Sequence, residues 1–178
     1  VIMKGYFGIG VERISKAMNA GAVMRTGHAF GADFSFFIGG PLSKNEISLS
    51  DTSNTENNLP TYFFEKPSDL LLPRACKLVG IEITEEAELL PSFKHPRMAA
   101  YILGSERLGL SEETLKLCDY IVKVPTKFSL NLALTGGIVL YDRISSLGNF
   151  SSRPLMPGGI KLENKSHNFG QPVIKNSS

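Results

Sequence analysis

Short apolar runs alternate with amphipathic and polar stretches along most of this chain. The runs at 4–9, 33–40, 61–65, 76–83, 98–104 and 120–124 are each bounded by glycine, proline or polar residues, as buried strands are. Helical features occupy the intervals 19–33, 111–118 and 130–147, with a short helical turn at 68–73. Strands that alternate with helices predict an α/β fold, here a single domain with a largely parallel sheet.

Local signals set the expected helix ends. Asn19 is expected to cap the first helix, which would end at Gly31, and Ser111 is expected to cap the second. Gly148 is the expected end of the last helix. The interval 42–60 is polar and rich in Ser, Thr and Asn, so it is expected to be one long loop.

The composition changes after the last predicted helix. From Asn149 onward the chain is rich in Pro, Gly, Ser and Asn, with scattered apolar residues such as Phe150, Leu155, Met156, Ile160 and Phe169. We therefore expect a folded domain at 1–148 and a C-terminal extension at 149–178, either wrapped on the domain or partly disordered, with the apolar residues slightly favouring wrapping.

Composition and charge are those of an ordinary globular protein. The chain has 178 residues, 42% of them hydrophobic and 20% charged, and a formal net charge of +2, which permits an anionic partner without arguing for one. No apolar run approaches the ~20 residues that span a bilayer, and the start lacks the pattern of a signal peptide. Cys76 and Cys118 have no zinc-site spacing and are expected to be small buried side chains, so a cytoplasmic location is the expectation.

Common catalytic and nucleotide-binding signatures do not account for this sequence. Gly8 and Gly10 begin like a dinucleotide-binding turn, but Arg13 stands where the third glycine belongs. No spacing relates His28, His95 or His167 to a nucleophile, so surface or core roles are expected for all three.

Three glycine-punctuated or proline-punctuated loops, at 18–27, 103–111 and 124–131, suggest a binding site. The last two follow apolar strands, and ligands collect beyond the carboxyl ends of parallel strands. A pocket made of backbone N–H and C=O groups suits a neutral heterocycle such as adenine, although each loop alone is also compatible with ordinary turn chemistry. The last helix also carries Gly136 and Gly137 in its middle, which lowers its stability by about 2 kcal/mol relative to alanine.

These three segments, in this order, resemble the three motifs of the SpoU/TrmH family of SPOUT RNA methyltransferases. The first motif is Asn-x-Gly with an Arg four residues after the Gly, and it stands here as Asn19, Gly21 and Arg25. The second is Gly-x-Glu-x-x-Gly-Leu-Ser, which stands here as Gly104, Glu106, Gly109, Leu110 and Ser111.

The third motif is a proline-containing loop that ends in Ser-Leu-Asn and leads into a helix with small residues and a late tyrosine. It stands here as Pro125, Ser129, Leu130, Asn131 and Tyr141, with a loop shorter than many members carry. The resemblance covers about 5–147.

The resemblance implies a sheet whose C-terminal part is tied as a deep trefoil knot, a homodimer, and binding of S-adenosyl-L-methionine in the knot, without a metal. It implies cofactor contacts from Leu103, Gly104, Glu106, Gly109, Val124, Ser129 and Leu130. The catalytic set that it implies is Arg25, Asn19, Glu106, Ser129 and Asn131. Small residues in the last helix would then allow close packing in the knot or across the dimer.

The implied reaction is methyl transfer to a ribose 2′-hydroxyl of RNA, leaving S-adenosyl-L-homocysteine. Because a guanidinium stays protonated, Arg25 is better suited to clamping an RNA phosphate and the developing alkoxide than to acting as a base. The small size of the chain favours tRNA over rRNA as substrate. Two alternatives stay open: a catalytically weak module that binds RNA or the cofactor, and an enzyme that methylates a base.

Overall fold

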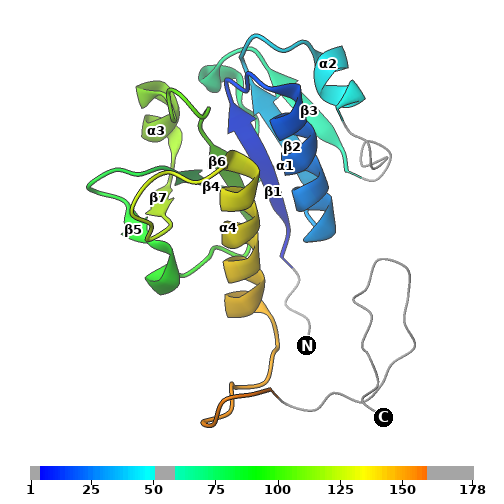
Figure 1. Cartoon of the computed structure of the whole chain (residues 1–178). Coiled ribbons are helices and arrows are strands. Elements are labelled where there is room, and N and C mark those ends of the chain that lie inside the picture. The colour runs from blue at the N-terminus through cyan, green and yellow to red at the C-terminus, as the bar shows by residue number, and fades with distance from the viewer. Residues whose placement is uncertain (1–4, 51–58, 160–178) are drawn as a thin grey trace.

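The computed structural model describes residues 5–50 and 59–159. Its centre is a seven-stranded sheet with the order β3-β2-β1-β6-β4-β7-β5, in which every neighbouring pair is parallel (Figure 1). The strands are β1 (Phe7–Glu12), β2 (Phe34–Ile38), β3 (Thr61–Phe64), β4 (Lys77–Ile81), β5 (Glu88–Leu89), β6 (Ala99–Leu103) and β7 (Tyr120–Lys123). The predicted α/β fold with a parallel sheet is confirmed.

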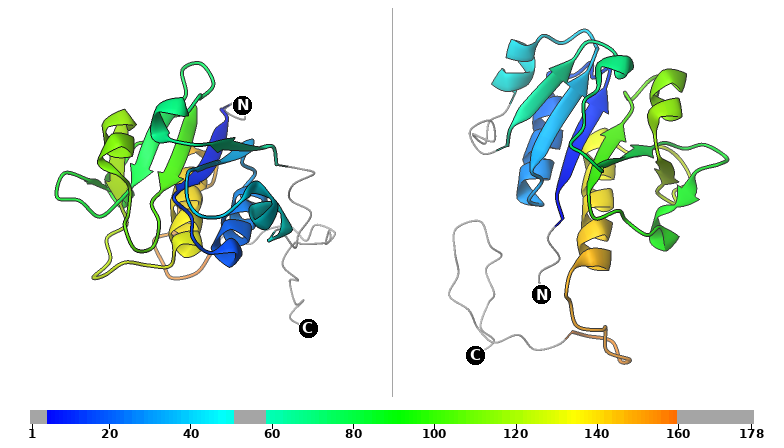
Figure 2. Two further views of the ribbon diagram at one scale, coloured as in Figure 1. Left: turned by 90° about the horizontal axis from the view of Figure 1, so that it is seen from above. Right: turned by 180° about the vertical axis from the view of Figure 1, so that it is seen from behind.

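Helices cover both faces of the sheet (Figures 1 and 2). The two long helices, α1 (Ala17–Ala29) and α4 (Leu132–Leu147), lie side by side on one face. The short helix α3 (Glu112–Leu117) and the 3₁₀ turn η2 (Pro67–Asp69) lie on the other face, while α2 (Lys44–Leu49) follows β2 near one edge. The smaller turn η3 (Leu90–Ser92) follows β5.

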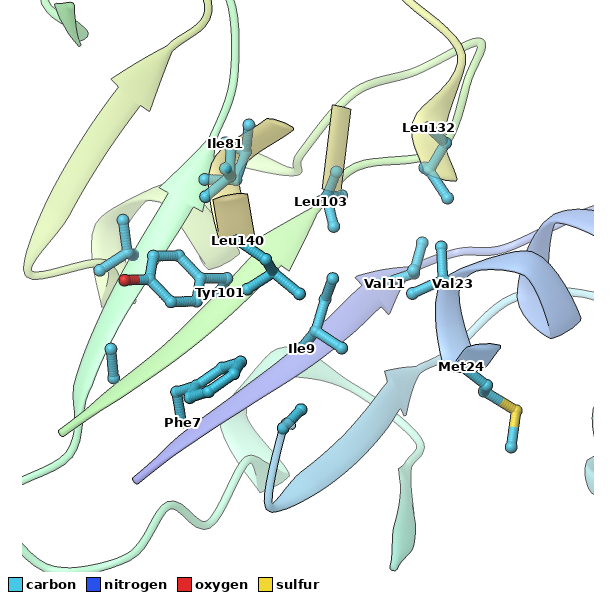
Figure 3. Close-up of a cluster of buried hydrophobic side chains, with 14 of the residues drawn as sticks. Phe7, Ile9, Val11, Val23, Met24, Ile81, Tyr101, Leu103, Leu132 and Leu140 are labelled. Atoms are coloured by element: carbon cyan, nitrogen blue, oxygen red, sulfur yellow. The ribbon is translucent and has the colours of Figure 1, made fainter. Parts of the chain in front are cut away.

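The main core lies between the sheet and the pair of long helices. Figure 3 shows Ile9 and Val11 of β1 and Leu103 of β6 facing Val23 of α1 and Leu140 of α4. All residues of β1 and β6 are buried, as the continuous apolar runs of a doubly covered parallel sheet predict. The fully buried β6 is also one of the strands whose carboxyl ends border the site described below.

Several sequence predictions of local structure are confirmed. Ser111 caps α3 through a hydrogen bond that its Oγ accepts from the backbone N–H of Thr114 at 3.1 Å, and α4 ends at Gly148. The apolar runs all form strands, with ends shifted by a few residues.

Two local predictions are wrong. Asn19 does not cap α1, because the helix begins at Ala17 with Lys16 as its N-cap. Asn19 lies in the first turn of the helix instead, and its side chain is buried. The interval 42–60 is not one loop, since α2 forms inside it with a capping box between Ser43 and Glu46. The Ser-x-x-Glu signal for that capping box stands in the sequence and outweighs the polar composition. The short β5 and η3 were not predicted, because they are too brief to give a periodic signal.

The C-terminal extension is described as far as residue 159. From Asn149 to that point it has no helix or strand, and Phe150, Leu155 and Met156 are exposed. This part therefore does not wrap onto the domain, although its apolar residues slightly favoured that arrangement in the sequence. Ile160 and Phe169 lie outside the described residues. The division at residue 148 stays a prediction.

Within the described ranges, no helix combines the length and the apolar character that a membrane span requires.

Candidate active site

A cavity of about 710 Å³ opens at the carboxyl ends of β4, β6 and β7. Its walls come from the ends of these strands and the segments that follow them, at 81–84, 103–110 and within 123–135, together with Leu115 of α3. This is the edge where ligands collect in parallel sheets. Each residue that the sequence predicts to contact the cofactor lines this cavity: Leu103, Gly104, Glu106, Gly109, Val124, Ser129 and Leu130.

The turn at 104–111 is tightly folded and depends on two glycines. A Cβ added to Gly104 would lie 2.0 Å from the carbonyl carbon of Gly109, which no side chain allows. Gly109 has a φ of +63°, in the left-handed region that glycine adopts at little cost. The turn itself therefore requires these glycines, and a larger residue at Gly104 would displace the turn rather than only fill the cavity.

Three charged residues hold this turn, although none of them belongs to the three sequence motifs. The buried Glu12 accepts a hydrogen bond from the backbone N–H of Ser111 at 2.8 Å. Glu82 accepts one from the N–H of Leu110 at 2.7 Å, and Arg13 Nη2 donates to the carbonyl of Gly109 at 3.0 Å. The available signal was an acidic residue where two of the strands end, Glu12 at the end of β1 and Glu82 directly after β4, because a parallel sheet gathers polar groups at that edge.

The structure brings Asn19 and Glu106 together. Asn19 lies on the buried face of α1, and its Nδ2 donates a hydrogen bond to Glu106 Oε1 in the turn that follows β6. Glu106 also lines the cavity. The first two motifs therefore meet in space, and the amide fixes one oxygen of the carboxylate at the cavity wall.

The third motif forms the rim and a helix cap. Asn131 is the N-cap of α4, and its Oδ1 accepts hydrogen bonds from the N–H groups of Ala133 at 3.0 Å and Leu134 at 3.3 Å. Ser129 is exposed and also lines the cavity. Asn131 thus has a structural function in α4 in addition to any contact with a ligand.

Arg25 lies apart from these residues. It is exposed on α1 and does not line the cavity. Six residues of α-helix turn the side chain by about 240° relative to Asn19, so the two leave the helix in different directions. Within the described parts of the chain, no hydrogen bond or ion pair holds its guanidinium.

The glycine pair of α4 packs within the chain. A Cβ at Gly136 would lie 3.1 Å from Ile9 Cδ1 of β1, which is tight, whereas one at Gly137 would lie 3.7 Å from Thr26 Cγ2 of α1. Gly136 thus lets α4 sit close to the sheet. The described chain places no backbone against Gly137 that would require a glycine.

A second polar network lies near the start of β6. His95, which is buried, contacts Tyr101 Oη through Nδ1 at 2.6 Å and Asp142 Oδ2 through Nε2 at 2.9 Å. Arg143 of α4 donates to Tyr101 Oη at 3.1 Å and to the carbonyl of Arg97 at 2.7 Å. Burial lowers the pKa of His95 and raises the pKa of Tyr101 to about 12. This confirms a core role for His95.

The cysteines have no catalytic character. Both are partly buried free thiols, and burial raises the pKa of Cys76 to about 11 and that of Cys118 to about 12. Thiols with such pKa values stay protonated and are weak nucleophiles. Among the described residues, no three His, Cys, Asp or Glu side chains gather as a metal site would require.

Comparison with known families identifies the class of protein that carries this site. The sequence profile of the SpoU rRNA Methylase family matches residues 7–141, which span every strand, α1 and most of α4. The chain belongs to this family.

Characterised relatives share parts of the chain. The tRNA (cytidine/uridine-2′-O-)-methyltransferase TrmJ of Pectobacterium atrosepticum is 36% identical over 85 residues, which are 46% of this chain and 31% of that protein. The tRNA (guanosine(18)-2′-O)-methyltransferase TARBP1 of mouse is 22% identical over 138 residues, or 72% of this chain and 9% of that protein. The chain thus spans less than a third of these relatives.

Solved structures share the fold. The SpoU methyltransferase AviRb from Streptomyces viridochromogenes in complex with AdoMet superposes with a TM-score of 0.71 at 22% identity, covering 82% of this chain and 59% of that one. A structure described as giving insights into 2-OH methylation of C/U34 on tRNA superposes with a TM-score of 0.69 at 22% identity, covering 80% of this chain and 97% of that one.

Proposed function

We propose that this chain is an S-adenosyl-L-methionine-dependent methyltransferase that acts on a ribose 2′-hydroxyl of RNA, with tRNA as the favoured substrate. The observation that carries the proposal is the cavity itself, which residues of the second and third motifs line and where Asn19 of the first motif holds the Glu106 carboxylate at the wall. The names of TrmJ and TARBP1 support a 2′-hydroxyl of tRNA as the acceptor.

The cavity fits an adenosyl cofactor. Its volume lies in the range of small-molecule sites, and apolar side chains such as Leu103 and Val124 alternate with backbone groups along its walls. Thr84 also lines it, and the buried hydroxyl of Thr84 has no hydrogen-bond partner among the described residues. A polar ligand in the cavity would supply that partner. When bound, S-adenosyl-L-methionine provides an electrophilic methyl group on a sulfonium.

The residues of the chain then position the acceptor. Asn19 holds the Glu106 carboxylate in one orientation, and the rim residues Ser129 and Asn131 offer polar groups to a ribose. Holding both reactants in line can supply several kcal/mol of barrier reduction. Arg25 would bind a phosphate and stabilise the alkoxide that develops as the hydroxyl loses its proton.

Because Arg25 lies outside the lining of its own cavity, we propose that it serves the cavity of a second copy in a homodimer. Leu134, Ile138 and Tyr141, which follow one another at helical spacing on α4, support such an assembly. Leu134 and Tyr141 are exposed, and α1 lies beside α4. A dimer that forms through this face would bury Leu134 and Tyr141 and would bring Arg25 close to the second copy.

We also propose that the C-terminal part of the sheet is tied as a trefoil knot, and the path of the chain supports this. The segment 124–131 leaves β7, which pairs with β4, and leads to α4, which packs against β1 and α1. It therefore crosses the ends of β4 and β6, where the segments that leave those strands also emerge. In a trefoil knot the last helix passes through a loop formed by earlier segments, and this requires such a crossing at the same edge of the sheet.

The test is transfer of labelled methyl groups from S-adenosyl-L-methionine to bulk RNA, with calorimetry of cofactor binding alongside. We expect a labelled tRNA fraction whose product resists alkaline cleavage at the modified position. An alkali-labile product would assign base methylation instead. Cofactor binding with no transfer to any RNA fraction would indicate a binding module, and mapping the nucleotide that loses its modification in a gene deletion would identify the target.

A further inference from the structure

A second cavity of about 580 Å³ lies beside the first. It is lined by Arg13, Ser15, Gly40, Pro41, Ser105, Arg107 and Leu108. Three of these residues, Ser105, Arg107 and Leu108, line the first cavity as well. The turn after β6 therefore forms a wall between the two cavities.

The lining combines apolar faces with cations. Pro41 is exposed, and Leu108 leaves 69% of its surface in solvent, so both offer apolar faces to a ligand. Arg13 and Arg107 add two positive charges, and Ser15 adds a hydroxyl. Unpaired nucleobases stack on aromatic or guanidinium faces, and a base that is held in a pocket also stacks between apolar side chains, with hydrogen bonds to its edge.

Arg13 links this second cavity to the first. Its φ of 55° lies in the left-handed region, which side chains other than that of glycine rarely adopt. Its Nη2 donates to the carbonyl of Gly109, while its buried Nε has no hydrogen-bond partner among the described residues and lies 3.8 Å from Glu12 Oε1. One guanidinium thus holds the turn that carries Glu106 and forms part of the second cavity.

We propose that the second cavity, between Pro41 and the turn at 105–108, holds an unpaired nucleobase of the RNA next to the methyl-transfer site. This inference rests on the proposed function. With the base in the second cavity, its ribose lies near the shared wall, close to Glu106. The cations Arg13 and Arg107 complement the phosphates on either side of that nucleotide. The chemical class of the ligand is therefore a single-stranded nucleotide rather than a duplex.

The test uses Pro41, which lines the second cavity and not the first. Pro41→Asp and Pro41→Lys are compared with Pro73→Asp and Pro73→Lys, the same changes at an exposed proline before β4. The measurements are the Kd for bulk tRNA by fluorescence anisotropy, the KM for tRNA in methyl transfer, and the Kd for S-adenosyl-L-methionine.

We expect both Pro41 variants to weaken tRNA binding and to raise the KM about tenfold, with cofactor affinity unchanged and the Pro73 variants like wild type. The lysine variant is the decisive one, because a purely electrostatic surface would bind RNA more tightly with an added cation. Tighter binding by Pro41→Lys, or Pro41 variants that match the Pro73 variants, would overturn the proposal.

These outcomes are distinct from failure of the proposed function. If wild type binds tRNA and the Pro41 variants bind it more weakly, but wild type transfers no methyl group, the nucleobase cavity is supported and the proposed reaction is refuted. If wild type methylates RNA and the Pro41 variants bind tRNA as wild type does, the reaction is supported and the nucleobase cavity is refuted. If wild type does not bind RNA, both proposals are refuted.

Discussion

The Asn19 carboxamide donates a hydrogen bond to the Glu106 carboxylate across 87 residues of sequence. Asn19 comes from α1 and Glu106 from the turn after β6, so this contact joins the first two motifs at the cavity wall. A carboxylate with one oxygen held by an amide has a fixed orientation toward a ligand. The pair is therefore the clearest point at which to test the site.

Truncating either member of this pair should impair catalysis more than cofactor binding. We expect Asn19→Ala and Glu106→Ala each to lower single-turnover methyl transfer by about 10²-fold, with a smaller change in cofactor affinity. The double variant should lose little more than either single variant, because the two residues act as a unit. Multiplicative losses would show that the residues act independently.

Thr84 should contribute to cofactor affinity. Thr84→Val keeps the shape of the side chain and removes the buried hydroxyl that has no partner in the described chain. We expect the Kd for S-adenosyl-L-methionine to rise severalfold, as loss of one hydrogen bond of about 1 kcal/mol predicts. Calorimetry checks this, with Thr26→Val on α1 as the control. Equal affinities in the two variants would exclude Thr84 from the cofactor site.

Arg25 should be needed for transfer and not for cofactor binding. We expect Arg25→Ala to lose methyl transfer by a factor of about 10² or more, and Arg25→Lys to recover little, because the ammonium lacks the planar fork. Arg74→Ala, at another exposed arginine, is the control.

A shared site also predicts complementation. Arg25→Ala and Glu106→Ala protomers, each weak alone, should regain activity when they are mixed and allowed to exchange, because one of the two sites in a mixed dimer is then complete. Light scattering measures the assembly. A stable monomer, or no recovery in a proven mixed dimer, would contradict the arrangement.

The two glycines of α4 should respond differently to alanine. At Gly137 the new Cβ meets only an ordinary contact at 3.7 Å, so Gly137→Ala should stabilise the fold by up to about 1 kcal/mol through helix propensity. At Gly136 the contact with Ile9 at 3.1 Å should offset much of that gain. Urea denaturation of both variants measures the difference, and a less stable Gly137→Ala would point to a contact outside the described chain.

His95 should make the fold less stable at acidic pH. Burial lowers its pKa below the ordinary value of 6.5, so the unfolded chain binds this proton more readily than the folded chain. The stability contributed by neutral His95 is therefore present above about pH 6.5 and is lost as the pH falls toward the folded-state pKa. Between pH 7.5 and pH 5.5, the Tm measured by thermal unfolding should fall less in His95→Gln than in wild type. The control is His28→Gln, a change at an exposed histidine.

The sequence by itself determined every strand except β5, the long helices and most of the cavity. Continuous apolar runs form β1 and β6 because strands covered on both faces exclude polar residues. The loops at 103–111 and 124–131 were placed correctly because they follow strands directly, and in a parallel sheet all carboxyl ends meet at one edge.

The tertiary structure alone decided how side chains are used. Asn19 has the chemistry of a helix cap, but burial against the 104–111 turn turns it toward Glu106 instead. Glu12, Arg13 and Glu82 gave no motif, because their function is to hold backbone groups of a turn distant in sequence. Local patterns report which residues are buried, but the partner of each buried polar group depends on how distant segments pack, so these contacts could only be found in the folded chain.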